Sequence, residues 1–349
     1  MNEKVVFIIG AGASKEAGLP TSDELINKII NHLDFDFDPF YNINKGNKII
    51  FQALKNICSS NAELEEYVET GLFIKNNLPL GKSIDNFIDN HRENKKIALL
   101  GKLAIIQSIL EAENNSTLNI KNKIQDDSLD LLRLKKAWYI PFYKIITENC
   151  NKDDLKDRFK NIILIIFNYD RCVEHFLFYS IRSYYNLSVN ETTEIIKNIK
   201  IYHPYGFVGP LPGFEQNNIP FGAKPNPEKL FELTDQIKTF TEEVLSADSD
   251  YLDIRKSIST ARKIVYLGFG FIDRNLEIIK PIAKISKNYP DIYASAYGFS
   301  VADRNEIKEK IKKSYGLSKL QIGFPEICFS DKEHKCYDFF QEFKLGLIY

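Results

Sequence analysis

The residues best suited to chemistry follow three short apolar runs. Gly10, Ala11, Gly12, Ala13 and Ser14 follow VVFII, Asn168, Tyr169 and Asp170 follow IILIIF, and His203 follows IKIY. Glycines let a backbone approach a phosphate, while amide, carboxylate and imidazole groups bind hydroxyls and transfer protons. Together they predict a nucleotide site with acid or base groups beside it.

The glycine turn differs from two common phosphate-binding motifs. A dinucleotide-binding turn has a third glycine three residues after the second, where this chain has Lys15. Gly81, Lys82 and Ser83 end like a P-loop, but Asn76 stands where that motif begins with glycine. A glycine turn that only joins a strand to a helix remains the alternative, since such turns are common in α/β folds.

The pattern of apolar residues predicts the elements that position these groups. Continuous apolar runs predict strands over 5–9, 162–167, 199–202, 263–268 and 292–297. Apolar residues spaced three and four apart predict helices over 22–33, 49–67, 84–113 and 128–149. We therefore expect a single α/β domain over 1–349, with a Rossmann-like parallel sheet and a large helical insertion over 34–160.

In such sheets, ligands bind beyond the carboxyl ends of the strands. A fourth group meets this condition, because Gly268 and Phe269 follow the run KIVYL and Asp273 opens a further helix predicted over the run NLEIIKPIAKI at 275–285. Asp273 also suits the N-cap of that helix. The segment 205–227 is rich in glycine and proline and follows His203, so we expect it to act as a lid.

Composition narrows the class of protein. With 46 Lys and Arg against 47 Asp and Glu, the net charge of −1 gives no general field for nucleic acid or anionic membranes. No apolar stretch approaches 18 residues, so we expect no membrane span and a cytoplasmic location. The five cysteines include no CxxC pair, so we expect no zinc site and no other metal.

These groups resemble the motifs of the sirtuin (silent information regulator) family, which binds NAD. GAGAS followed by Gly18, Leu19 and Pro20 is similar to the family's GAGxSxxxGIPxFR, although Thr21 and Ser22 replace the Phe and Arg of deacylases. FNYD is similar to the TTNYD form of the QNID block, and His203 to the histidine of the HG block. GFGF with Asp273 is similar to LGYSFxD of the prokaryotic branch.

The resemblance implies NAD as substrate, with the glycine turn, Pro20, Gly268, Phe269 and Asp273 contributing to its binding. It favours the anti-phage branch, whose members cleave NAD to ADP-ribose and nicotinamide and deplete it in the infected cell. It also implies a homo-oligomer, or a neighbouring defence protein such as a motor ATPase as partner.

Nicotinamide leaves NAD through an oxocarbenium-like state, as in glycoside cleavage. Asn168 is expected to hold a ribose hydroxyl and a water, His203 to accept a proton, and Asp170 to orient these groups or offset positive charge. Two alternatives remain. One is NAD-dependent deacylation or ADP-ribosyl transfer, and the other is a non-catalytic subunit that senses NAD or ADP-ribose.

Overall fold

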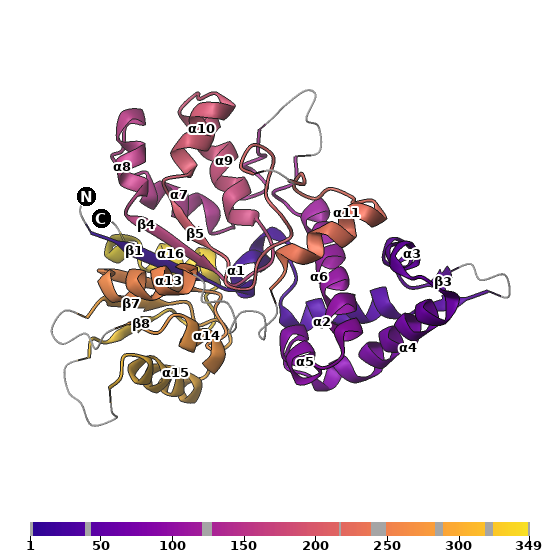
Figure 1. Cartoon of the computed structure of the whole chain (residues 1–349). Coiled ribbons are helices and arrows are strands. Elements are labelled where there is room, and N and C mark those ends of the chain that lie inside the picture. Colours follow the sequence, from indigo (N-terminus) through magenta and orange to yellow (C-terminus); the bar gives the residue numbers. More distant parts are fainter. Residues whose placement is uncertain are drawn as a thin grey trace.

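Six parallel strands form the central sheet of the computed structural model shown in Figure 1. The structure describes residues 3–38, 43–120, 128–215, 218–238, 249–282, 289–317 and 324–347. The strands are β1 (Val5–Ile9), β4 (Ile162–Ile166), β5 (Lys200–Tyr202), β6 (Lys263–Leu267), β7 (Asp291–Ala294) and β8 (Ile327–Phe329). The predicted α/β class with a Rossmann-like sheet is therefore confirmed.

The strand order is β5-β4-β1-β6-β7-β8, which is the order of dinucleotide-binding Rossmann folds. β4 and β5 lie on one side of β1, and β6, the next strand along the chain, pairs with the other side of β1. Ile9, the last residue of β1, lies level with Ile166 of β4 and Leu267 of β6. The loops that follow these three strands therefore begin side by side at the point where the strand order reverses.

Both faces of the sheet are buried, which explains the continuous apolar runs in its strands. Alternate residues of β1 point to opposite faces: Val5 and Phe7 pack in one apolar cluster, and Val6 and Ile8 in the other. The first face is covered by α7 (Tyr139–Ile146), α9 (Cys172–Tyr184) and α16 (Cys336–Glu342). The second is covered by α13 (Ser249–Thr260) and α15 (Val301–Ser314).

Five helices between β1 and α7 form a helical lobe beside the sheet (Figure 1). They are α2 (Ser22–Leu33), α3 (Lys48–Ile57), α4 (Asn61–Asn77), α5 (Ile84–Asn90) and α6 (Lys95–Asn115), with a hairpin of β2 (Asp36–Phe37) and β3 (Ile43–Lys45). Within the predicted insertion 34–160, α7 and α8 (Leu155–Phe159) pack with the sheet cluster instead. α2, which precedes residue 34, packs on α4 and α6 of the lobe.

Capping residues explain where the predicted helices begin and break. The helix predicted over 22–33 is confirmed as α2, where Thr21 and Glu24 form a capping box. The helices predicted over 49–67 and 84–113 are each two helices, because Ser60 caps α4 and Asn94 caps α6. Of the helix predicted over 128–149, the structure retains only α7. The strand β8 was not predicted.

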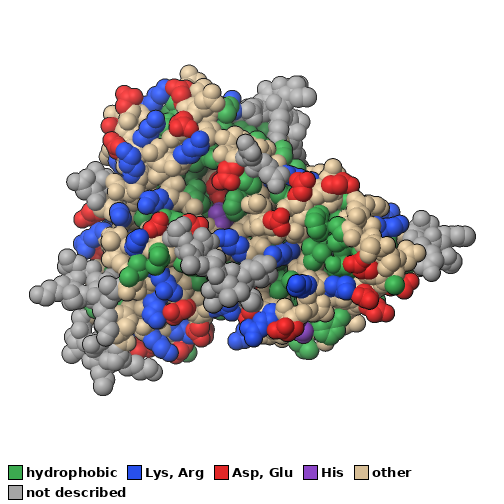
Figure 2. Space-filling view, viewed as in Figure 1, with side chains coloured by type: hydrophobic (Ala, Val, Ile, Leu, Met, Phe, Trp, Pro, Cys, Tyr) green, Lys and Arg blue, Asp and Glu red, His purple; other side chains and the backbone are tan. Residues whose placement is uncertain are grey.

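The other helices of the described residues are short. They are α1 (Ala11–Ser14), α10 (Val189–Ile196), α11 (Pro227–Glu232), α14 (Asp273–Ile278) and α17 (Lys344–Leu347), with 3-10 turns at Lys15–Ala17, Leu78–Leu80, Lys152–Asp154 and Leu233–Gln236. Acidic and basic side chains are interspersed over the face shown in Figure 2. In the described part of the chain, no helix is both long and apolar enough to cross a membrane.

Candidate functional site

A cavity of about 310 Å³ lies beyond the carboxyl ends of β1, β4 and β6. Its walls come from both the sheet and the helical lobe. They include Gly10, Ala11, Gly12, Pro20, Asp23, Ser83, Asp85, Phe167, Asn168, Tyr169, Asp170, Tyr205, Gly268, Phe269, Gly270 and Asn275. The volume is at the lower end of the range for small-molecule pockets. The structure thus brings the glycine turn, the Asn168 group and the Gly268 group to one place.

The loops after β1 and β6 pack against each other with backbone in direct contact. The Gly12 amide donates to the Gly268 carbonyl over 3.1 Å. Gly268 has φ +54°, and a Cβ there would stand 2.0 Å from the Ala13 nitrogen. A Cβ on Gly10 would stand 2.5 Å from the Gly268 oxygen. These glycines are therefore required by the protein's own packing, whatever they do for a ligand.

The glycine turn opens only a short helix. α1 has four residues and continues as a 3-10 turn, so it lacks the aligned peptide dipoles of a long helix. Ala11 and Pro20 line the cavity, whereas Ala13 and Ser14 are buried. The Ala13 carbonyl accepts a hydrogen bond from Trp138 Nε1 at 3.0 Å. Ala13 and Ser14 therefore support the turn from behind.

Asn168 joins the end of β4 to the glycine turn. Its side chain is buried and donates to the Gly10 carbonyl over 3.1 Å and to Ser14 Oγ over 2.8 Å. These two bonds fix the orientation of the amide at the cavity wall. Asn168 is thus placed where the sequence predicts it, with its amide nitrogen already engaged by protein groups.

Asp170 is buried beside Asn168 and also lines the cavity. Its Oδ1 accepts the backbone N–H of Cys172 at 3.1 Å. Burial raises the pKa of Asp170, and hydrogen bonds from Cys172 and Ser14 oppose this shift. The carboxyl therefore holds its proton more tightly than an ordinary aspartate does.

His203 does not line this cavity. It lies in a second cavity of about 230 Å³ with Glu174 and Arg171. Its Nε2 is 2.7 Å from Glu174 Oε1, and its Nδ1 is 3.2 Å from the Asn168 carbonyl oxygen. Burial alone would lower the pKa of His203, but the Glu174 carboxylate and these hydrogen bonds raise it overall. Both ring nitrogens face acceptor oxygens of the protein, so neither is directed at a ligand in the first cavity.

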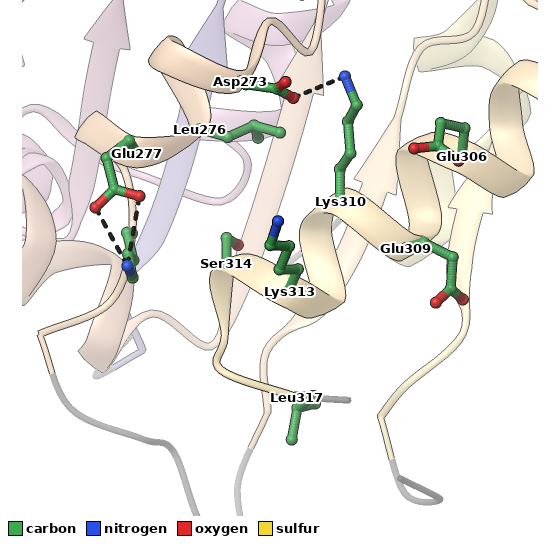
Figure 3. Close-up of a pocket in the computed structure, with 10 residues that line it drawn as sticks. Asp273, Leu276, Glu277, Glu306, Glu309, Lys310, Lys313, Ser314 and Leu317 are labelled. Atoms are coloured by element: carbon green, nitrogen blue, oxygen red, sulfur yellow. Dashed lines mark hydrogen bonds and ion pairs between the residues drawn. The ribbon is translucent and has the colours of Figure 1, made fainter. Parts of the chain in front are cut away.

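Asp273 lies outside the cavity as well. Its side chain is 83% exposed, and it pairs with Lys310 of α15 at 2.8 Å (Figure 3). The hydrogen bond from Lys310 lowers the pKa of Asp273. Ile272 occupies the N-cap position of α14, so Asp273 is the first helical residue and not the cap expected from the sequence.

The helical lobe and the loops contribute cavity residues that the sequence did not indicate. The Tyr169 hydroxyl donates to Asp85 Oδ1 of α5, and the Tyr205 hydroxyl donates to Asn275 Oδ1 of α14. Burial raises the pKa of Asp85 to about 6. No local pattern marks Asp85, because it lies inside a predicted helix far along the chain from the other site residues.

The expected lid is anchored to the protein. The Arg171 guanidinium donates to the carbonyls of Gly209, Ile219 and Pro220, at 2.6 to 3.2 Å. Arg171 itself is 1% exposed. The described part of segment 205–227 is therefore held by buried hydrogen bonds, unlike a lid that opens freely.

The charged residues among the described lining of the cavity are all acidic. Three carboxyl groups, those of Asp23, Asp85 and Asp170, line it, and no lysine or arginine is among its described lining residues. Such a cavity favours a ligand with a positive centre. Neither a protein-family model nor a curated protein sequence matches this chain.

Proposed function

We propose that this chain binds NAD in the cavity and hydrolyses it to ADP-ribose and nicotinamide. One observation carries the proposal: Asn168 and Asp170 line the same cavity as the packed glycine loops, at the reversal point of the strand order. Dinucleotides bind at this point in sheets of this order. The resemblance to sirtuin motifs identifies NAD as the dinucleotide to test first.

The charge of the cavity suits the reaction. The nicotinamide ring of NAD carries a positive charge, which moves to the ribose as the glycosidic bond breaks. Carboxylates placed around this centre stabilise the oxocarbenium-like state. Asp23, Asp85 and Asp170 supply such groups. The phosphates would rely on other loop N–H groups than those of Gly10, Gly12, Ala13 and Gly268, which already donate to protein acceptors.

Asn168 fits the role of orienting the ribose. Its bonds to Gly10 and Ser14 hold the amide rigidly against the glycine turn. A group fixed in this way costs no reorganisation when the reaction occurs. His203 contributes indirectly in this arrangement, through its hydrogen bond to the Asn168 carbonyl.

Incubation of the purified protein with NAD alone, followed by chromatography of the products, tests the proposal. We expect equal amounts of nicotinamide and ADP-ribose, without any acylated peptide. Product formation only in the presence of an acyl-lysine peptide or a protein acceptor would identify a deacylase or an ADP-ribosyltransferase instead. Depletion of NAD in infected cells is the physiological role that the sirtuin resemblance implies for a hydrolase.

A non-catalytic sensor of NAD or ADP-ribose is the second candidate. The position of His203 favours it, because the predicted base is engaged by Glu174 outside the cavity. A sensor would bind NAD in calorimetry and leave it intact over hours. It would act through a partner or through other copies of the chain.

A further inference from the structure

The helical lobe places a carboxylate in the cavity, opposite the strand ends. α5 contributes Asp85, whose Oδ1 accepts a hydrogen bond from the Tyr169 hydroxyl of the loop after β4. Ser83, at the N-cap of α5, lines the same cavity. A hydrogen bond thus joins Asp85 of the helical lobe directly to Tyr169 of the loop that follows β4.

We propose that Asp85 is the general base that activates the attacking water. This inference rests on the proposed hydrolysis of NAD and assigns a residue that the sirtuin resemblance does not indicate. It makes Asp85 a catalytic residue and the helical lobe a part of the active site.

The other candidate bases are less suitable. Asp170 is 3% exposed, and its carboxyl already accepts hydrogen bonds from Cys172 and Ser14. His203 lies in the second cavity with both nitrogens directed at acceptors. Asp85 also lines the cavity, but as a residue it is only half-buried, unlike Asp170.

The surroundings of Asp85 suit a base at neutral pH. Burial raises its pKa to about 6, against the hydrogen bonds from Tyr169 and its own backbone and the charge of Arg274. Arg274 of α14 is itself paired with Asp89 at 3.1 Å, and Asp23 of α2 lines the same cavity. Asp85 is therefore mostly ionised at pH 7 and is a stronger base than an ordinary aspartate.

The step conserves atoms and charge. The bond between the ribose anomeric carbon and the nicotinamide nitrogen breaks, and its electron pair leaves with neutral nicotinamide. The water oxygen bonds to the anomeric carbon while Asp85 takes one water proton. The products are nicotinamide, ADP-ribose and a protonated Asp85, which then releases its proton to solvent.

The contacts around α5 position this base. Tyr169 holds Asp85 from the sheet, and the Arg274–Asp89 ion pair ties the same helix to α14. Both contacts join the helical lobe to the sheet beside the cavity. Movement of α5 away from the sheet would withdraw the base and leave the glycine loops in place.

The test compares Asp85→Asn with Asp36→Asn, the same change at an exposed residue of the lobe. NAD hydrolysis is followed from pH 5 to 8, and NAD affinity and thermal unfolding are measured in parallel. We expect Asp85→Asn to lower kcat by about 100-fold or more, the usual scale for a lost general base. NAD affinity should change less than about threefold. In the wild type we expect the hydrolysis rate to rise with pH near 6, as Asp85 ionises, and this rise should be absent from Asp85→Asn. Asp36→Asn should behave as the wild type.

The possible failures are distinguishable. A folded Asp85→Asn protein that retains the wild-type kcat and pH profile overturns the assignment, while NAD hydrolysis stands. Loss of NAD binding together with turnover also overturns it, since Asp85 would then be a binding residue. A wild-type protein that releases no nicotinamide contradicts the proposed function itself, and the base assignment with it.

Discussion

Arg171 and Glu113 form an ion pair that is buried on all sides, with side chains 1% and 0% exposed. Arg171 Nε donates to Glu113 Oε1 over 3.1 Å, and the Gly222 amide donates to Glu113 Oε2 over 3.0 Å. The pair links the end of α6 in the helical lobe, the residue after Asp170, and the loop after β5. Three segments around the cavity thus depend on one pair of charges.

Removal of one partner should therefore destabilise the whole protein. We expect Glu113→Gln to lower the free energy of unfolding by about 3–5 kcal/mol, because Arg171 would remain buried without its counter-charge. Chemical denaturation measures this change. Glu111→Gln, on the same helix but 40% exposed, is the control and should change stability by less than about 1 kcal/mol. Equal stability of the two variants would contradict the structure.

Two glycine substitutions separate packing from ligand binding. Gly12→Ala should lower the melting temperature, because its Cβ would stand 2.9 Å from the Gly268 Cα. Gly270 lines the cavity, and the nearest atom to a Cβ there is 3.9 Å away. Gly270→Val should therefore keep the melting temperature and weaken NAD binding in calorimetry. Unchanged affinity in that variant would exclude this wall as the binding surface.

The His203–Glu174 pair should make stability depend on pH. The pKa of His203 is raised in the folded protein. The pair therefore stabilises the folded state in full below about pH 6.5, the pKa of a histidine in the unfolded chain. This stabilisation should decline as pH rises through the higher folded pKa. Asp170 and the Asn168 carbonyl act in the same direction as Glu174. The difference in unfolding free energy between wild type and His203→Gln should therefore shrink from pH 6 to pH 9; a constant difference would mean that His203 is neutral.

The acidic cavity should discriminate between dinucleotides. NADP carries a further phosphate, and the described lining offers three carboxyl groups and no lysine or arginine to receive it. We expect NADP to bind at least about tenfold more weakly than NAD, which corresponds to about 1.4 kcal/mol. Calorimetry with both dinucleotides at one ionic strength measures the ratio. Tighter binding of NADP would show that the phosphates meet a basic surface elsewhere.

The sequence predicted the strand ends better than the directions of side chains. The continuous apolar runs before Gly10, Asn168 and Gly268 mark buried strands, and parallel pairing brings their ends together. β5 ends at Tyr202, and the Gly206 N–H donates to the His203 carbonyl over 3.0 Å, so His203 and Tyr205 lie in a turn where strand alternation no longer applies. For this reason periodicity could not show that Tyr205, and not His203, reaches the cavity.

Local sequence patterns could not predict contacts between segments that are far apart in the chain. Asp85 meets Tyr169 only because the helical lobe packs against the sheet, and no spacing in the chain encodes that contact. The strand β8 has three residues, which is too short for a clear alternation. The sequence correctly predicted that Asp273 begins a helix. It did not predict the ion pair with Lys310, in which the exposed Asp273 side chain lies outside the cavity.

Parallel pairing also determines how the protein can be attached to a surface or fused to a reporter. β1 begins at Val5, which therefore lies at the amino edge of the sheet, opposite the cavity. The ammonium group of Lys263, the first residue of β6, donates a hydrogen bond to the Gly346 carbonyl of α17. This bond places α17 at the same edge. Figure 1 shows both ends together on that side. A tag joined ahead of β1 or behind α17 would therefore attach at that edge, away from the cavity.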